Sequence, residues 1–94
     1  MSFIVRQYLV DKLQTHDLKV VFQDNVGFHS VFIRHERFEI HYVVRDTGYI
    51  YIKNVEFTSD DKDYQLLFQY EKTLEKILKE YFELNEYLKL KRNK

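Results

Sequence analysis

The sequence contains no cysteine, proline, tryptophan or alanine, and it has only two glycines. The absence of cysteine excludes disulfide bonds and thiolate metal sites, which fits a reducing compartment, so we expect a cytoplasmic protein. No stretch approaches the ~18 apolar residues of a membrane span, and no membrane partner is expected. With so few glycines there is also no glycine-rich phosphate-binding loop.

An excess of either charge sign is absent as well. Fifteen acidic residues balance fifteen basic ones over 94 residues. Proteins dedicated to duplex DNA are usually basic, and proteins that mimic DNA are strongly acidic, so the composition favours neither class. A chain of this length predicts one domain, residues 1–94, with a thin hydrophobic core.

Aromatic residues are abundant, with eight tyrosines and eight phenylalanines. Large rings pack well on the pleated surface of a sheet. Helical spacing of apolar residues near both ends, and alternation between them, predict an α+β fold. The expected order is an N-terminal helix, a four-stranded antiparallel β-meander and a long C-terminal helix. The expected bounds are 3–14 and 60–92 for the helices, and 18–24, 28–34, 37–45 and 49–57 for the strands.

The first helix has a recognisable start and a buried stripe. Ser2 can cap it, because a serine hydroxyl accepts a hydrogen bond from the amides of the first turn. Val5, Leu9 and Leu13 then recur at the spacing that places them on one side of the helix.

Three turns set the expected strand registers. We predict that Asp24 pairs with Gly27 and Arg34 with Arg37, and that Asp46-Thr47-Gly48 forms a type I turn closed by a glycine bulge. The three registers agree on one apolar face, and a slip of one residue would turn a strand over. That face collects Leu18, Val20, Phe22, Val31, Ile33, Phe38, Ile40, Tyr42, Val44, Ile50 and Ile52.

The other sheet face mixes rings with cations, whereas a solvated face is normally polar. Phe28, Val43 and Tyr51 are expected to form one row across it, and Val55 and Phe57 to lie on the same face. Single-stranded nucleic acid needs such rings for stacking and cations for phosphates. Two other readings stay open: one terminal helix covers this face, or another protein does. The candidate interaction surface is Phe28, Phe32, His41, Val43, Arg45, Tyr49, Tyr51 and Lys53.

The last helix is long for a chain of this size. Thr58 or Ser59 is expected to cap it, and its span of about 32 residues corresponds to roughly 48 Å, against ~30 Å for a small domain. The unmatched part predicts either a partner helix in a homodimer or a bend near Asn85. The candidate helix interface is Leu74, Ile77, Tyr81, Leu84 and Leu88.

The chain ends in a basic tail made of Lys89, Lys91, Arg92 and Lys94. Four cations without an acid suit a phosphate or an acidic partner. They are equally the residues that complement the negative end of a helix dipole.

Motifs for chemistry are weak. The four histidines, His16, His29, His35 and His41, fall on different faces or in turns, so we expect no metal site, no cofactor and no small-molecule substrate. Ser30 and His41 are expected to be neighbours, but a triad also needs an orienting acid and an oxyanion hole. No catalytic residue is predicted.

Three functions follow from these patterns. The first is a non-enzymatic regulatory protein, phage- or mobile-element-encoded, which binds a protein such as a host nuclease or transcription factor. The second is single-stranded DNA or RNA binding, since four strands followed by a helix are similar in outline to whirly and Pur-type single-strand-binding folds. The third is a small ribonuclease-type enzyme using His41, Arg45, Tyr51 and Lys53.

Overall fold

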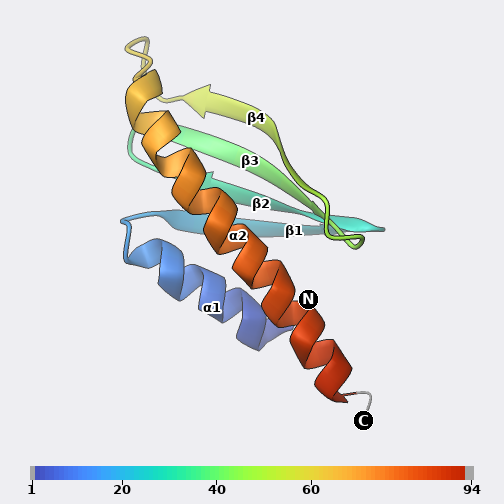
Figure 1. Ribbon diagram of the computed structural model, residues 1–94. Helices are drawn as coiled ribbons and strands as arrows, with labels where there is room; N and C mark the ends of the chain where they lie inside the picture. Colours follow the sequence, from blue (N-terminus) through green and yellow to red (C-terminus); the bar gives the residue numbers. More distant parts are fainter. Residues whose placement is uncertain (1, 93–94) are drawn as a thin grey trace.

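The computed structural model describes residues 2–92 and confirms the α-β-β-β-β-α order (Figure 1). Its elements are α1 (Phe3–Gln14), β1 (Lys19–Asn25), β2 (Phe28–Arg34), β3 (Phe38–Arg45), β4 (Ile50–Phe57) and α2 (Tyr64–Arg92). The strands form one antiparallel sheet in the order β1-β2-β3-β4, so sheet order follows chain order. The fold is therefore the predicted meander between two helices.

Helix α1 has the predicted bounds. The Ser2 hydroxyl accepts a hydrogen bond from the Val5 amide at 3.3 Å, and this satisfies one of the free N–H groups of the first turn. The stripe of Val5, Leu9 and Leu13 is fully buried. The sequence therefore fixes both where this helix starts and which side it buries.

The first two hairpins are shifted by two residues from their predicted registers. Asn25 pairs with Phe28 around a Val26-Gly27 turn, in which Gly27 has φ +82°. In the next hairpin the His35 amide donates to the Phe38 carbonyl at 2.8 Å, and Arg34 pairs with Glu39 instead of Arg37. A shift of two residues leaves every side chain on its predicted face, because side chains alternate with a period of two.

The third hairpin has its predicted turn, with Gly48 at φ +94° and Val44 paired with Ile50. Beyond His41 and Tyr42 the pairing shifts at a β-bulge that leaves Lys53 without a partner in β3. The bulge reverses the remainder of β4. Val55 and Phe57 therefore pack against the core, which corrects their predicted place on the other face.

Helix α2 begins at Tyr64, four residues later than expected. Its cap is Asp63, whose carboxylate accepts from the Leu66 amide at 3.0 Å. Neither Thr58 nor Ser59 caps it. The Thr58 hydroxyl instead donates to the Glu36 carbonyl at 2.9 Å, which joins the end of β4 to the β2–β3 turn.

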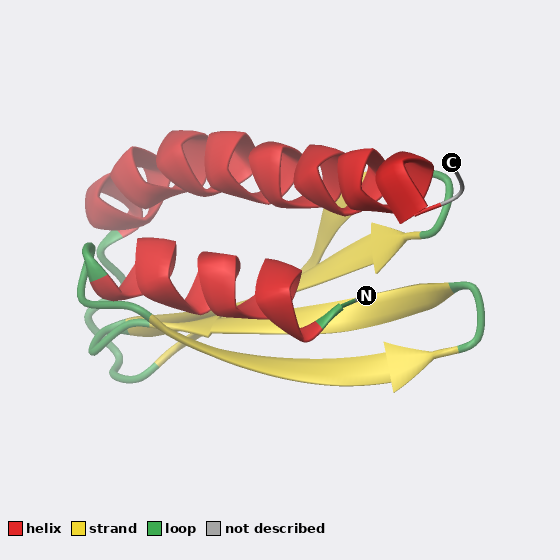
Figure 2. Ribbon diagram, turned by 90° about the horizontal axis from the view of Figure 1, so that it is seen from below, coloured by secondary structure: helices red, strands yellow, loops and turns green. Residues whose placement is uncertain are grey.

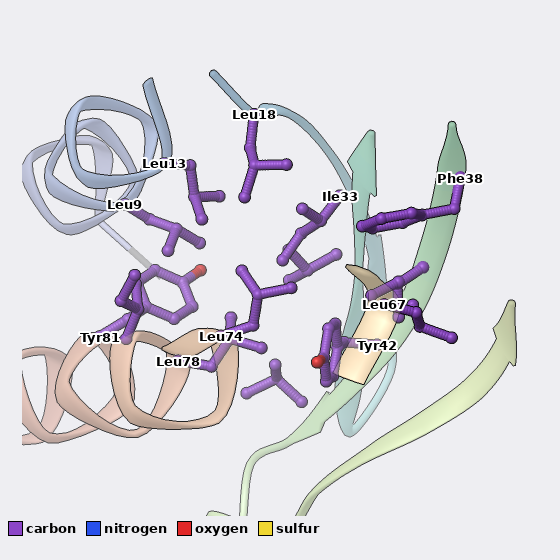
Figure 3. Packing of buried hydrophobic residues seen from close by; sticks show 14 of the residues in the cluster. Leu9, Leu13, Leu18, Ile33, Phe38, Tyr42, Leu67, Leu74, Leu78 and Tyr81 are labelled. Atoms are coloured by element: carbon purple, nitrogen blue, oxygen red, sulfur yellow. The ribbon is translucent and has the colours of Figure 1, made fainter. Parts of the chain in front are cut away.

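Both helices lie on the same face of the sheet, as Figures 1 and 2 show. The core fills the space between them and the sheet, where Leu9, Ile33, Leu74 and Tyr81 are fully buried (Figure 3). Within residues 2–92, no helix covers the opposite face. This excludes, for the described chain, the reading in which each helix takes one face.

Helix α2 has no bend near Asn85, which corrects one of the two predictions for its length. It runs unbroken to Arg92, and it crosses the sheet diagonally beside α1 (Figure 1). Tyr81 is fully buried, Leu84 and Leu88 pack against the core, and Asn85 is buried instead of marking a break. The molecule is 51 Å long as a result.

Candidate binding surface on the open face of the sheet

The surface without a helix cover carries the residues that the sequence singled out. The register places Ser30, Val43 and Tyr51 in one row across β2, β3 and β4. Phe28 lies in the neighbouring row opposite Arg45, which corrects the predicted Phe28–Val43–Tyr51 row. We call the following set the open-face patch: Phe28, Phe32, His41, Val43, Arg45, Tyr49, Tyr51 and Lys53.

Rings of the open-face patch contact one another across strands. Phe32 and His41 are directly opposite in the register, and their rings stack with centroids 4.2 Å apart and planes 25° apart. Tyr49, just before β4, and Tyr51, on β4, have ring centroids 5.2 Å apart. The sequence-predicted rings are therefore brought together as two pairs and not as one continuous row.

Two small side chains lie at the bottom of the patch. Val43 is 2% exposed and Ser30 4% exposed, although no described helix lies over them. Because Phe28, Phe32 and Tyr51 are only half-buried, the larger side chains shield the row beneath and keep part of their own surface in solvent. The result is a packed aromatic layer with accessible ring surface.

Charge on this face is unevenly distributed. At one end Arg34 pairs with Glu39 at 3.0 Å, and Glu56 lies beside them opposite Glu39. At the other end the Arg45 guanidinium lies 5.8 Å from the Phe28 ring centroid, and Lys53 lies at the bulge in the middle of the face, near His41. Among the described residues, Arg45 and Lys53 form no ion pair, so their charges are available to an anion.

His41 is held in place by its neighbours. Its Nε2 lies 2.9 Å from the Ser30 hydroxyl. Burial lowers the pKa of His41, and the nearby Lys53 ammonium lowers it further. The ring is therefore neutral near pH 7, which suits a stacking surface. Within residues 2–92 His41 makes no hydrogen bond to a carboxylate, so the Ser30–His41 pair lacks the orienting acid of a triad.

The candidate helix interface lies mostly inside the fold. Leu74, Ile77 and Tyr81 are buried within the chain's own core, and Leu84 and Leu88 pack at its border. The chain itself therefore occupies the candidate helix interface. The large apolar residues of α2 that are exposed lie outside the candidate helix interface: Tyr64, Phe68, Tyr87 and Leu90.

The basic tail is partly described. Lys89 pairs with Glu86 at 3.6 Å, one turn earlier on α2, and Lys91 is exposed. Lys94 and the side chain of Arg92 lie outside the described part of the chain. Residues 2–92 hold no group of three metal-ligating side chains. None of their helices is both long and apolar enough to cross a membrane.

Comparison with known proteins leaves the geometry as the guide to function. Searches against protein-family models, curated proteins and solved structures returned no match for this chain. The open-face patch is therefore interpreted from its own chemistry.

Proposed function

We propose that this protein is a non-enzymatic binding protein that holds single-stranded nucleic acid on its open-face patch. One observation carries the proposal: accessible aromatic rings lie beside cations without an ion pair, on a face that no described helix covers. Every base has a flat face that can stack on a ring, and Arg45 and Lys53 can contact phosphates. A neutral overall charge fits a ligand bound locally by stacking and few phosphate contacts.

Fluorescence anisotropy with an unstructured labelled oligonucleotide tests the proposal. At low salt we expect a dissociation constant below about 50 µM, because stacking adds to phosphate contacts. Two phosphate contacts predict a shallow salt dependence, with a log–log slope of roughly −1.4 for a single strand. No binding up to this concentration would disprove the function.

Matched variants locate the site. Tyr51→Ala and Arg45→Gln should each weaken binding by about tenfold, because each removes one stacking or phosphate contact. The controls are Phe68→Ala and Lys62→Gln, which change an exposed ring and an exposed cation away from the patch. An equal loss in the controls would assign the binding to another surface.

A second candidate function is protein binding, including self-association. The observation that favours it is exposed apolar surface at the end of the molecule where α1 begins and α2 ends (Figure 2). There Phe3 is 80% exposed and Leu90 68% exposed, and such surface is costly in water. Light scattering tests self-association, and Phe3→Ser with Leu90→Ser should turn a dimer into a monomer. A wild-type monomer would rule out a homodimer.

A further inference from the structure

A groove runs between α2 and the inner side of β4, and it reaches the β4 edge at Tyr49 and Tyr51 of the open-face patch. It has a volume of about 620 Å³, within the usual range for small-molecule sites. Ile50 and Ile52 of β4 line it with Tyr42 of β3, and Lys72, Lys76 and Lys79 line it from α2. Gly48 meets the Phe82 ring near one end.

The groove follows from the path of α2. The helix starts beside the end of β4 and crosses diagonally toward β1, so it does not cover the beginning of β4 (Figure 1). Ile50 and Ile52 point to the core side yet stay only partly buried. They provide an apolar wall with solvent access.

Tyr42 adds a polar group that lacks a partner. Its side chain is almost fully buried, and its hydroxyl has no hydrogen-bond partner within residues 2–92. Most buried polar atoms have a partner, so a buried hydroxyl without one calls for an explanation. A ligand oxygen would supply that partner once the side chains over the buried hydroxyl move apart to admit it.

The rim of the groove carries a net positive charge. The three lysines are exposed and recur along one side of α2, and among the described residues they form no ion pair. Glu75 of α2 lies at the same rim. Burial raises the pKa of the Tyr42 hydroxyl, and Glu71, also on α2, raises it further. Three ammonium groups thus outnumber two carboxylates, which favours a ligand with a single negative charge.

We propose that this groove binds a small amphipathic anion, such as a medium-chain carboxylate. Its apolar body would lie on Ile50, Ile52 and the Tyr42 ring, and its charged group would contact the lysines and the Tyr42 hydroxyl. This site meets the open-face patch at the edge of β4, where Tyr49 and Tyr51 belong to both, but its lysines and Tyr42 lie outside the patch.

Titration of the isotope-labelled protein with decanoate, followed by NMR, tests the site. Below the micelle concentration, shifts should concentrate at residues 42, 50–52 and 72–79. Ligand efficiency predicts a dissociation constant on the order of 100 µM. Decan-1-ol and decyltrimethylammonium, with the same chain but no negative charge, should bind at least about ten times more weakly. Absence of shifts at about 1 mM decanoate, or equal binding of the alcohol, would overturn the proposal.

Variants assign the contacts. Changing Lys72, Lys76 and Lys79 together to Gln should weaken decanoate binding by about tenfold or more, because it removes the positive rim. Changing Lys62, Lys89 and Lys91 to Gln alters net charge equally, outside the groove, and should leave the affinity unchanged. Tyr42→Phe keeps the ring and should weaken binding by about threefold or more. An unchanged affinity in Tyr42→Phe or the groove triple variant, or an equal loss in the control triple variant, would refute the assignment.

Discussion

His29 on β2 and Tyr81 on α2 are joined inside the core, with the histidine Nε2 2.9 Å from the tyrosine hydroxyl. They are 52 residues apart in the chain, and both are buried. Their ring centroids are 5.8 Å apart in an edge-on arrangement. This contact ties the second half of the long helix to the sheet.

Removing the Tyr81 hydroxyl should destabilise the fold. In Tyr81→Phe, a buried ring nitrogen of His29 loses its hydrogen-bond partner, which costs roughly 1–2 kcal/mol of unfolding free energy. Urea denaturation followed by circular dichroism measures this. An unchanged midpoint would mean that the His29–Tyr81 hydrogen bond contributes nothing net to stability.

The same substitution at Tyr42 should have the opposite sign. Its hydroxyl is buried without a partner in the described chain, so Tyr42→Phe removes a desolvated polar group and keeps the ring. We expect the free energy of unfolding to rise by about 1 kcal/mol. The same urea experiment checks this, and a loss of stability would indicate that the hydroxyl has an ordered partner.

Stability should fall on mild acidification because of His29. Burial, together with the nearby Arg6 cation, lowers the pKa of His29 from 6.5 to about 4. Between these two values the unfolded chain binds a proton that the folded chain does not, so unfolding is favoured as the pH falls. Over this window the loss reaches about 3 kcal/mol.

Denaturation at pH 7, 5.5 and 4 measures that loss. His29→Gln should flatten the part of the dependence between pH 6.5 and 4. His16→Gln, which changes an exposed histidine, should retain it. If all three proteins have the same pH profile, His29 is not the group responsible.

The two glycines should differ in their tolerance of a side chain. Both have positive φ, but a Cβ at Gly27 would meet nothing within 4 Å, whereas one at Gly48 would lie 3.1 Å from Phe82 Cε1. Gly27→Ala should therefore cost about 1 kcal/mol from backbone strain alone, and Gly48→Ala about 2 kcal/mol. Thermal unfolding of both variants tests the order, and equal losses would mean that Phe82 moves aside freely.

The start of α2 can be tested by its cap. Asp63→Ala should cost about 1 kcal/mol, because the Leu66 amide loses its acceptor. Ser59→Ala, at a position that the sequence favoured as a cap, should be nearly neutral. Chemical denaturation distinguishes them, and a larger effect at Ser59 would move the helix start back toward the loop.

Particular residues show what the sequence could and could not predict. The faces of the first two hairpins were correct although their registers were not. In the first, the turn can be closed by Asp24 and Gly27 or, one residue later, by Asn25 and Phe28, and this step shifts the strand register by two. The bulge in β4 was missed, yet its signal was present. Apolar residues step from Ile50 to Ile52 and then to Val55 and Phe57, and this change of spacing marks the extra residue.

The sequence did not predict that both helices pack on the same face of the sheet. Both sheet faces carry apolar residues in the central strands, for example Ile40 and Val43 on opposite sides of β3, so hydrophobicity alone does not select the covered face. The residues of the open-face patch were predicted, because alternation fixes which side chains share a face. Their pairing into Phe32–His41 and Tyr49–Tyr51 required the true registers.

The uninterrupted order of the sheet has a kinetic consequence. Every strand pairs with its neighbour in the chain, so each hairpin can form by closing a short loop, and such local topologies fold quickly. The ends of the chain behave differently, because α1 meets α2 across a separation of 72 residues between Tyr8 and Glu80. We therefore expect the meander to form first and the contact between the helices to form last.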